Sequence, residues 1–284
     1  MEEFVIADCE AFMKIIDAHI HYNPGDEYFD RIAAAAGCKN TEHGLRKEFG
    51  QHHIVHGIVM GNRDLSFSNH QYPDFLSYCI GLDSFYLKEH VLSDALPLVE
   101  AHLQQEQCAG IKLYPGYNRF YVNDPLCHPF YELAEHYGKP VAIHTGATAG
   151  SNALLKYSHP LTIDEVATVF PRVNFVMCHL GNPWITDAVA VLDKNPNVAA
   201  DLSGILEGRK EMDAFLQRQK GFLSYIRTWL SYLDDYSRLM YGTDWPLANE
   251  ADYIRFASAL IPEEQLENFF FHNALRIYKR INLL

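Results

Sequence analysis

The sequence lacks the features typical of secreted and membrane-spanning proteins. Its six cysteines are scattered and none stands in a C-x-x-C pair. That distribution predicts reduced thiols in the cytoplasm rather than a disulfide framework or a cysteine zinc site. No stretch reaches the ~18 apolar residues of a membrane span. The opening residues 1–4 carry no basic segment, so we expect no signal peptide.

Positive charge is also scarce. The chain has 23 lysines and arginines against 36 acidic residues, which gives a formal net charge of −13 with histidine neutral. Such a protein repels phosphate backbones and anionic membrane surfaces. We therefore expect a small-molecule substrate as the partner and no binding to nucleic acid or membranes.

The most informative stretch is the apolar run at residues 15–20, which contains His19 and is followed by His21. Side chains alternate between the two faces of a strand, so Asp17, His19 and His21 are expected on one face. Two imidazoles at the end of a strand can chelate one metal ion. A lone His-x-His is a weak signal, and the rest of the chain must support it.

Eight short apolar segments, separated by helical patterns, predict eight strands. Alternating strands and helices favour parallel pairing with right-handed crossovers. Eight such units in 284 residues indicate an α/β fold of the (β/α)8 TIM-barrel type. No linker or low-complexity segment interrupts it, so we expect one domain over residues 1–284. The expected strands are 15–21, 56–60, 75–82, 109–114, 141–144, 174–180, 197–202 and 239–244.

Helical patterns occupy the intervals between these segments. Gly138 is expected to end one helix, and Thr162 with Glu165 predicts a capping box at the start of another. The expected helical segments are 22–54 after an initial loop, 84–107, 125–138, 162–170, 184–192, part of 205–237, and 263–280.

Polar side chains recur at the predicted strand ends, where barrel enzymes place their chemistry. Imidazoles with a carboxylate suit zinc or another first-row divalent ion. A bound ion would lower the pKa of water toward ~7. His179 suits proton transfer because the ordinary pKa of histidine lies near neutrality, and Asp244 can both bind metal and accept a proton. The strand-end residues are His19, His21, Lys112, His144, His179 and Asp244.

Six segments, in order over nearly the whole chain, resemble the amidohydrolase superfamily. The resemblance is strongest to its amidohydrolase-related (amidohydrolase 2) branch, which includes aminocarboxymuconate-semialdehyde decarboxylase, resorcylate decarboxylases and lactone hydrolases. Each segment alone is unspecific, but together they are highly specific. They are Ile16–His21, Gly110–Pro115, Pro140–Gly146, Cys178–Trp184, Tyr241–Pro246 and Asn273–Tyr278.

The resemblance implies a metal centre in a TIM barrel. It makes His179 either a second-site ligand or the general acid and base. In two-metal members of the superfamily the lysine at the position of Lys112 is carboxylated and bridges the metals, whereas one metal is the norm in this branch. We therefore expect one divalent ion, with zinc favoured, and two if Lys112 is carboxylated. The implied ligands are His19, His21, His144 and Asp244.

Three further residues are candidates for substrate binding. Lys112 offers a polar or cationic group close to the site. Arg119, in the loop after the fourth strand, can grip a substrate carboxylate bidentately or form a loop salt bridge. Tyr114 at that strand's end is either a substrate contact or barrel packing. Cys178, expected in a strand and facing away from His179, is interpreted as packing.

The sequence leaves several functions open. The leading one is a metal-dependent hydrolase that attacks a small carboxylic ester, lactone or amide through a metal-activated water. The alternative is a non-oxidative decarboxylase with the same ligands. A non-catalytic metal-binding paralogue would be expected to have lost a strand-end residue. A TatD-type deoxyribonuclease normally has an acidic residue in place of Lys112, and the net charge also disfavours it. A homodimer through helical faces is compatible with such a barrel.

Overall fold

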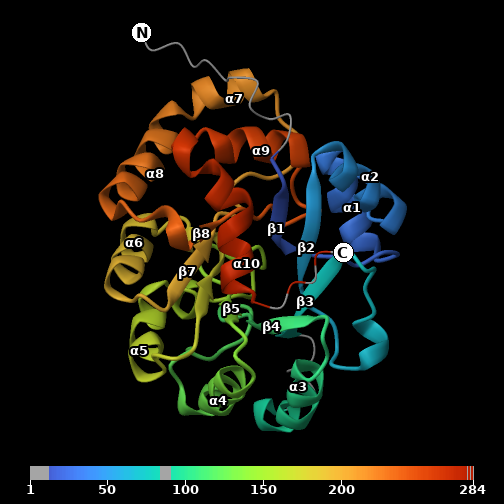
Figure 1. Cartoon of the computed structure of the whole chain (residues 1–284), viewed down its shortest axis with the longest axis vertical. Coiled ribbons are helices and arrows are strands. Elements are labelled where there is room, and N and C mark those ends of the chain that lie inside the picture. The colour runs from blue at the N-terminus through green and yellow to red at the C-terminus, as the bar shows by residue number, and fades with distance from the viewer. Residues whose placement is uncertain (1–12, 84–90, 280, 282, 284) are drawn as a thin grey trace.

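The computed structural model describes residues 13–83, 91–279, 281 and 283. Its eight parallel strands form one sheet in which each strand pairs with the next along the chain. Helices surround the strands as an outer layer (Figure 1). The strands are β1 Ile15–Ile20, β2 Ile54–Met60, β3 Leu76–Leu82, β4 Cys108–Leu113, β5 Val141–Ile143, β6 Phe175–Met177, β7 Val198–Asp201 and β8 Leu239–Met240.

Main-chain hydrogen bonds join the last strand to the first. Ala18 N donates to Tyr241 O at 3.0 Å, and Asp244 N donates to His19 O at 2.8 Å. These bonds bring β8 and the turn after it against β1, so the sheet closes on itself. The predicted TIM barrel is confirmed.

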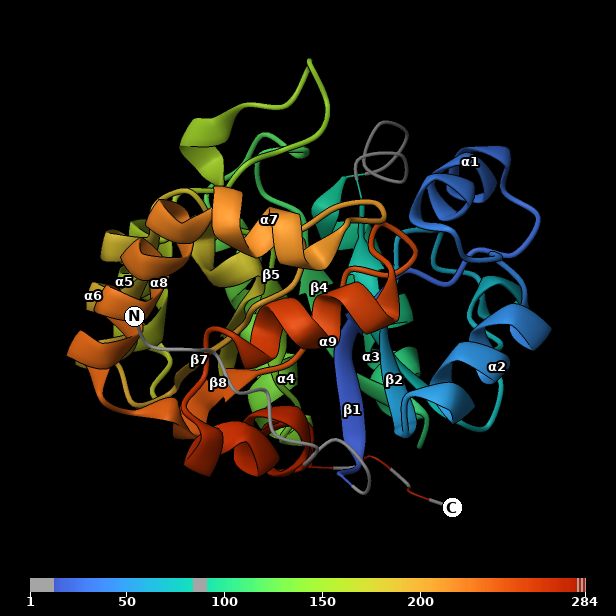
Figure 2. The same cartoon turned by 90° about the horizontal axis from the view of Figure 1, so that it is seen from above.

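An α-helix follows each strand except β2, where a 3-10 turn at Phe67–Asn69 leads to β3. In both views α1 and α2 lie together beside β2 (Figures 1 and 2). No helix among the described residues is long and apolar enough to cross a bilayer. The helices are α1 Glu27–Ala36, α2 Glu42–Gln51, α3 Leu96–Leu103, α4 His128–Tyr137, α5 Leu161–Val169, α6 Ile185–Lys194, α7 Met212–Arg218, α8 Lys220–Leu233, α9 Glu250–Ser258 and α10 Asn273–Ile277.

Two apolar clusters hold the layers together. The larger lies between the strands and the helices, and the smaller fills the barrel interior. Small and medium side chains such as Ala18, Ala142 and Ala199 line the interior because eight strands leave little room there. Tyr278, just after α10, packs with them, and α10 crosses in front of the strands in Figure 1. The region around α10 therefore closes one end of the barrel. The polar strand-end residues lie at the other end.

One predicted helix end is confirmed and one start is wrong. Gly138 ends α4 with a left-handed φ of 62°. Thr162 is not an N-cap, because α5 already begins at Leu161 after Pro160. Proline, with its φ fixed near the helical value, starts the turn earlier than the capping pattern suggested. The carboxylate of Glu165 instead accepts a hydrogen bond from the Asn123 side chain.

The C-terminal helix is less regular than expected. Over the predicted segment 263–280 the chain forms a 3-10 turn, a π-helical turn at Asn268–His272 and the short α10. Arg280 lies outside the described residues, as do Cys9 and the part of the predicted segment 84–107 at residues 84–90.

His56 on β2 gives a prediction for stability against pH. Its Nε2 lies 2.9 Å from Ser77 Oγ, and burial lowers its pKa to about 4. Because the unfolded value is ~6.5, the unfolded chain binds more protons between these values, and stability falls as the pH falls through that window. Between pH 7.5 and 4.5, we expect the free energy of unfolding of the wild type to fall by about 2–3 kcal/mol more than that of His56→Gln. Urea unfolding at both pH values measures this, and parallel pH curves would contradict it.

Candidate metal centre

The two histidines of the first strand meet the aspartate that follows the last. His19 Nε2 lies 3.3 Å from Asp244 Oδ1, and His21 Nε2 lies 3.1 Å from the same oxygen. One ligand atom from each of the three residues falls within 4.8 Å of the others. Three of the four predicted ligands therefore form one compact group at the end of the barrel where the strands finish.

Two atoms of this group have no hydrogen-bond partner among the described residues. They are His19 Nε2 and Asp244 Oδ1, and both are buried. A buried polar atom left unpaired costs about 1–3 kcal/mol. A cation between them would satisfy both atoms, so the donor set fits a metal ion.

The outer nitrogens of the β1 histidines are held by acceptors. His19 Nδ1 lies 3.0 Å from Asp201 Oδ2, and His21 Nδ1 lies 3.0 Å from Met60 O. A carbonyl oxygen only accepts, and Asp201 is ionised: burial would raise its pKa, but the neighbouring imidazole of His19 and its hydrogen bond hold that pKa well below the usual range. Both Nδ1 atoms therefore donate, and the lone pairs of both imidazoles are on Nε2.

His144 and His179 are held in the same way. His144 Nε2 donates to Ala147 O at 3.1 Å, and His179 Nδ1 donates to Ser203 O at 3.2 Å. Their remaining nitrogens, His144 Nδ1 and His179 Nε2, face each other 3.1 Å apart. His179 therefore connects His144 to the compact group, because the ring centroid of His179 lies 4.8 Å from that of His19.

Burial keeps the imidazoles of His19 and His144 neutral near pH 7. It lowers the pKa of His19 to about 4 although Asp201 opposes the shift, and it lowers the pKa of His144 well below the ordinary value. Burial would raise the pKa of Asp244, but the neighbouring imidazoles of His21, His19 and His179 hold it far below its usual range. Near pH 7 the site is thus an anionic carboxylate among imidazole lone pairs, which is a cation-binding arrangement.

The backbone turns sharply at the residues that carry this chemistry. The predicted strand 174–180 ends at Met177, and His179 and Leu180 take left-handed φ values of 62° and 45°. Asp244 has a φ of 66°. Such backbone is unfavourable for residues with a side chain and is found where function requires it. The turns place both side chains inside the barrel end rather than along a strand.

The predicted substrate-binding residues lie at different depths. Lys112 is 1 % exposed and its Nζ lies 2.7 Å from Cys178 Sγ. Tyr114 is buried and donates from its hydroxyl to the carbonyl oxygens of Met60 and Gly61. Arg119 is exposed in the loop after β4. The substrate contacts of these three residues stay predictions.

With this geometry in place, sequence comparison decides the family. A sequence profile described as amidohydrolase matches residues 91–280. This chain belongs to the amidohydrolase family. No curated protein matches it.

Solved structures share its fold. A TIM-barrel protein from Bordetella bronchiseptica is 20% identical with a TM-score of 0.69, over 95% of this chain and 99% of that one. A 5-carboxyvanillate decarboxylase from Sphingomonas paucimobilis is 14% identical with a TM-score of 0.65, over 94% and 99%. A probable 2-pyrone-4,6-dicarboxylic acid hydrolase from Acinetobacter baumannii is 15% identical with a TM-score of 0.61, over 94% and 100%. Family membership identifies the chain as an enzyme, an amidohydrolase-family TIM barrel.

Sequence reasoning missed the role of Asp201, which holds two histidines of the site by hydrogen bonds. Asp201, at the end of β7, binds His19 Nδ1 through one oxygen. Its other oxygen accepts from the backbone N–H of His179 at 3.0 Å and from the hydroxyl of Ser203. The signal in the sequence was the alternate spacing of Asp201 and Ser203 at a strand end, but their partners lie on other strands.

Asp17 is placed differently from the prediction. Its carboxylate accepts hydrogen bonds from the backbone N–H of His19 and of Thr243, each at 3.1 Å. The register between β1 and β2 shifts between Asp17 and Ile20. This irregularity breaks the strict alternation of faces, so Asp17 ties β1 to the turn after β8.

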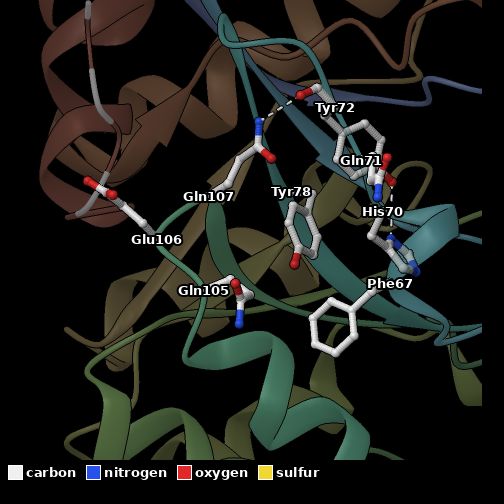
Figure 3. A pocket seen from close by; sticks show the side chains of 8 residues that line it. All are labelled: Phe67, His70, Gln71, Tyr72, Tyr78, Gln105, Glu106 and Gln107. Carbon is white, nitrogen blue, oxygen red and sulfur yellow. Dashed lines mark hydrogen bonds between the residues drawn. The ribbon is translucent and has the colours of Figure 1, made fainter.

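A cavity of about 440 Å³ lies beside β3, and none of its lining residues belongs to the histidine group (Figure 3). Aromatic rings of Phe67, Tyr72 and Tyr78 form part of its wall. Gln107 is engaged there, since its Nε2 donates to Tyr72 O at 3.0 Å. The predicted chemistry therefore does not lie in this cavity.

Gly204 allows a test of the packing around His179. A Cβ at this position would lie 2.7 Å from His179 Nδ1 and 3.1 Å from Asp244 Oδ2. We expect Gly204→Ala to lower kcat about 10–100-fold, as for loss of a residue that orients a ligand. Gly138→Ala is the matched control, because its φ of 62° resembles the 64° of Gly204 but nothing lies within 4 Å. The control should lose about 1 kcal/mol of stability and keep its kcat; equal losses of kcat would contradict the prediction.

Proposed function

We propose that this amidohydrolase-family enzyme is a metal-dependent hydrolase of small carboxylic esters, lactones or amides. One observation carries the proposal. Four imidazoles use their outer N–H groups on fixed acceptors, which turns the lone pairs of the inner nitrogens toward one another and toward Asp244. That arrangement is expected for a site that holds a cation.

His19, His21 and Asp244 would hold the ion, with His144 as the fourth ligand. We propose zinc, since three imidazoles and one carboxylate are a common zinc set. When bound, the ion lowers the pKa of water toward ~7 and polarises a carbonyl oxygen. The protein contributes the orientation of each ring through Asp201, Met60 O and Ala147 O.

His179 is proposed as the group that moves protons. Its Nδ1 is engaged by Ser203, which leaves Nε2 to take a proton from the attacking water and return it to the leaving group. Burial lowers the pKa of His179, so Nε2 is unprotonated and ready to accept near pH 7. Asp244, held as an anion, can accept a second proton. Arg119 and Lys112 are proposed to attract a substrate carboxylate.

The second candidate is a non-oxidative decarboxylase. Structural relatives at comparable similarity include both the 5-carboxyvanillate decarboxylase and a 2,6-dihydroxybenzoate decarboxylase from Rhizobium. In that reaction His179 would protonate the carbon that loses carbon dioxide, and the ligand set would be unchanged. The two reactions therefore differ in product rather than in the residues required.

The experiment compares products on one panel of substrates. Purified protein loaded with zinc is given lactones, esters and aromatic carboxylic acids, and acid release and carbon dioxide release are recorded in parallel. We expect acid release without carbon dioxide, and its loss in Asp244→Asn. Carbon dioxide release would replace the hydrolase by the decarboxylase, and a protein that binds no divalent ion would overturn both.

A further inference from the structure

Lys112 lies inside the barrel with a thiol as its polar partner. Its side chain is 1 % exposed, and Nζ lies 2.7 Å from Cys178 Sγ. Among the residues that the structure describes, no carboxylate forms an ion pair with Lys112. A buried ammonium group is costly without a charged partner, and the proposed hydrolysis does not require this pairing with Cys178.

The separation of the two atoms is informative. Contacts of the N–H···O type span about 2.7–3.2 Å, and sulfur is larger than oxygen, so an N–H···S hydrogen bond should be longer than the one seen here. A direct nitrogen–sulfur bond would be much shorter. The observed 2.7 Å suits two atoms joined through one bridging oxygen.

We propose that Lys112 and Cys178 form a covalent Nζ–O–Sγ crosslink, with dioxygen as the oxidant. The amine and the thiol each lose one hydrogen, one oxygen atom is inserted between nitrogen and sulfur, and the other leaves as water: R–NH2 + HS–R′ + O2 → R–NH–O–S–R′ + H2O. Nitrogen and sulfur each lose two electrons, and dioxygen takes all four. Bonding of an oxidised cysteine sulfur to nitrogen has precedent in sulfenamides.

The crosslink would join β4 to the turn after β6 directly beside the proposed metal centre. Cys178 Sγ lies within 4.8 Å of ligand atoms of His19 and Asp201. The bond would also remove the positive charge of Lys112, so in the crosslinked protein the attraction of a substrate carboxylate that we propose for Lys112 and Arg119 would rest on Arg119 alone. Burial raises the pKa of the Cys178 thiol, so the reactive thiolate is scarce near neutral pH and we expect the bond to form slowly in air.

Intact-mass measurement tests the crosslink without any enzymatic turnover. Full-length protein is purified with and without oxygen, and tryptic peptides locate the bond. Air-exposed wild type should gain about 14 Da, from one oxygen added and two hydrogens lost. The gain should be absent without oxygen, reversed by dithiothreitol, and absent in Cys178→Ala and Lys112→Met. Cys127→Ala is the matched control, since the Cys127 thiol is also buried and donates to the backbone carbonyl of Tyr121, and this variant should keep the crosslink.

Three results would overturn the proposal, and all come from the wild type, which needs no variant to fold. One is an unchanged mass after prolonged exposure to air. Another is a gain of about 16 or 32 Da on the Cys178 peptide alone, which marks oxidation of the thiol without a link. The last is a loss of about 2 Da, which marks a direct nitrogen–sulfur bond. These results come from mass alone, so they do not decide between hydrolysis and decarboxylation.

Discussion

Asp244→Asn is expected to abolish tight metal binding and to remove nearly all activity. Within the part of the chain that the structure describes, the Asp244 carboxylate is the only anion that meets both β1 histidines, and its Oδ1 lies within 3.3 Å of each Nε2. Loss of an outer partner of a metal ligand typically costs about 10–100-fold, so loss of a charged ligand should cost more. Elemental analysis of the purified variant should show little metal, and kcat/KM should fall on the order of 10³-fold or more relative to wild type.

The control is the same change on an exposed carboxylate. Asp193 lies on the exposed side of α6, so Asp193→Asn should keep both metal and activity. Circular dichroism and urea unfolding establish that both variants fold. If Asp244→Asn retained one metal per chain and more than a tenth of the activity, the proposed ligand set would be wrong.

His179→Asn is expected to separate proton transfer from metal binding. The variant loses the imidazole Nε2 that we propose as the proton carrier, and general acid–base groups typically contribute about 10²–10⁴-fold. Asparagine is the appropriate replacement because His179 has a φ of 62°, and asparagine tolerates left-handed backbone better than most residues. We expect kcat to fall by about that factor while the metal content stays near that of wild type.

His144→Asn is compared with His179→Asn, because the two histidines face each other in the site. It removes a proposed ligand, so metal affinity should fall with activity, whereas His179→Asn should lose activity alone. Metal titration monitored by a competing chelator distinguishes the two variants. If His179→Asn lost its metal as readily as His144→Asn, His179 would be a ligand instead of the proton carrier.

The barrel was predictable because its signals are local. Each strand is a short apolar run that ends at a turn residue, and parallel pairing brings the ends of such runs together without further information. For that reason the polar strand-end residues could be placed at one end of the barrel before any geometry was known, and the family resemblance then singled out His19, His21 and Asp244 among the expected metal ligands. The same reasoning identified the helices from their spacing, and Gly138 as the end of one of them.

The remaining details depend on contacts between distant residues. The hydrogen bond from His19 to Asp201 joins two strands that are far apart in sequence. The left-handed turn at His179 has no sequence signal, because left-handed backbone is usually marked by glycine. That turn also shortened the predicted strand at 174–180. Cys178 packs in the barrel interior as expected, and it also meets Lys112 there, which the sequence did not predict. Asp17 was misplaced because the register shift in β1 leaves no trace in the alternation of residue types.

The junction between β1 and β8 sets the order in which a newly made chain can acquire its ion. His19 and His21 leave the ribosome with the first strand of the barrel, and Asp244 emerges only after the last strand. A partly made chain would offer two imidazoles without their anion, so capture of the ion should wait for the final strand. Ligand that binds only the completed protein stabilises it by mass action, and metal uptake would then act as a late check that the whole chain has been assembled.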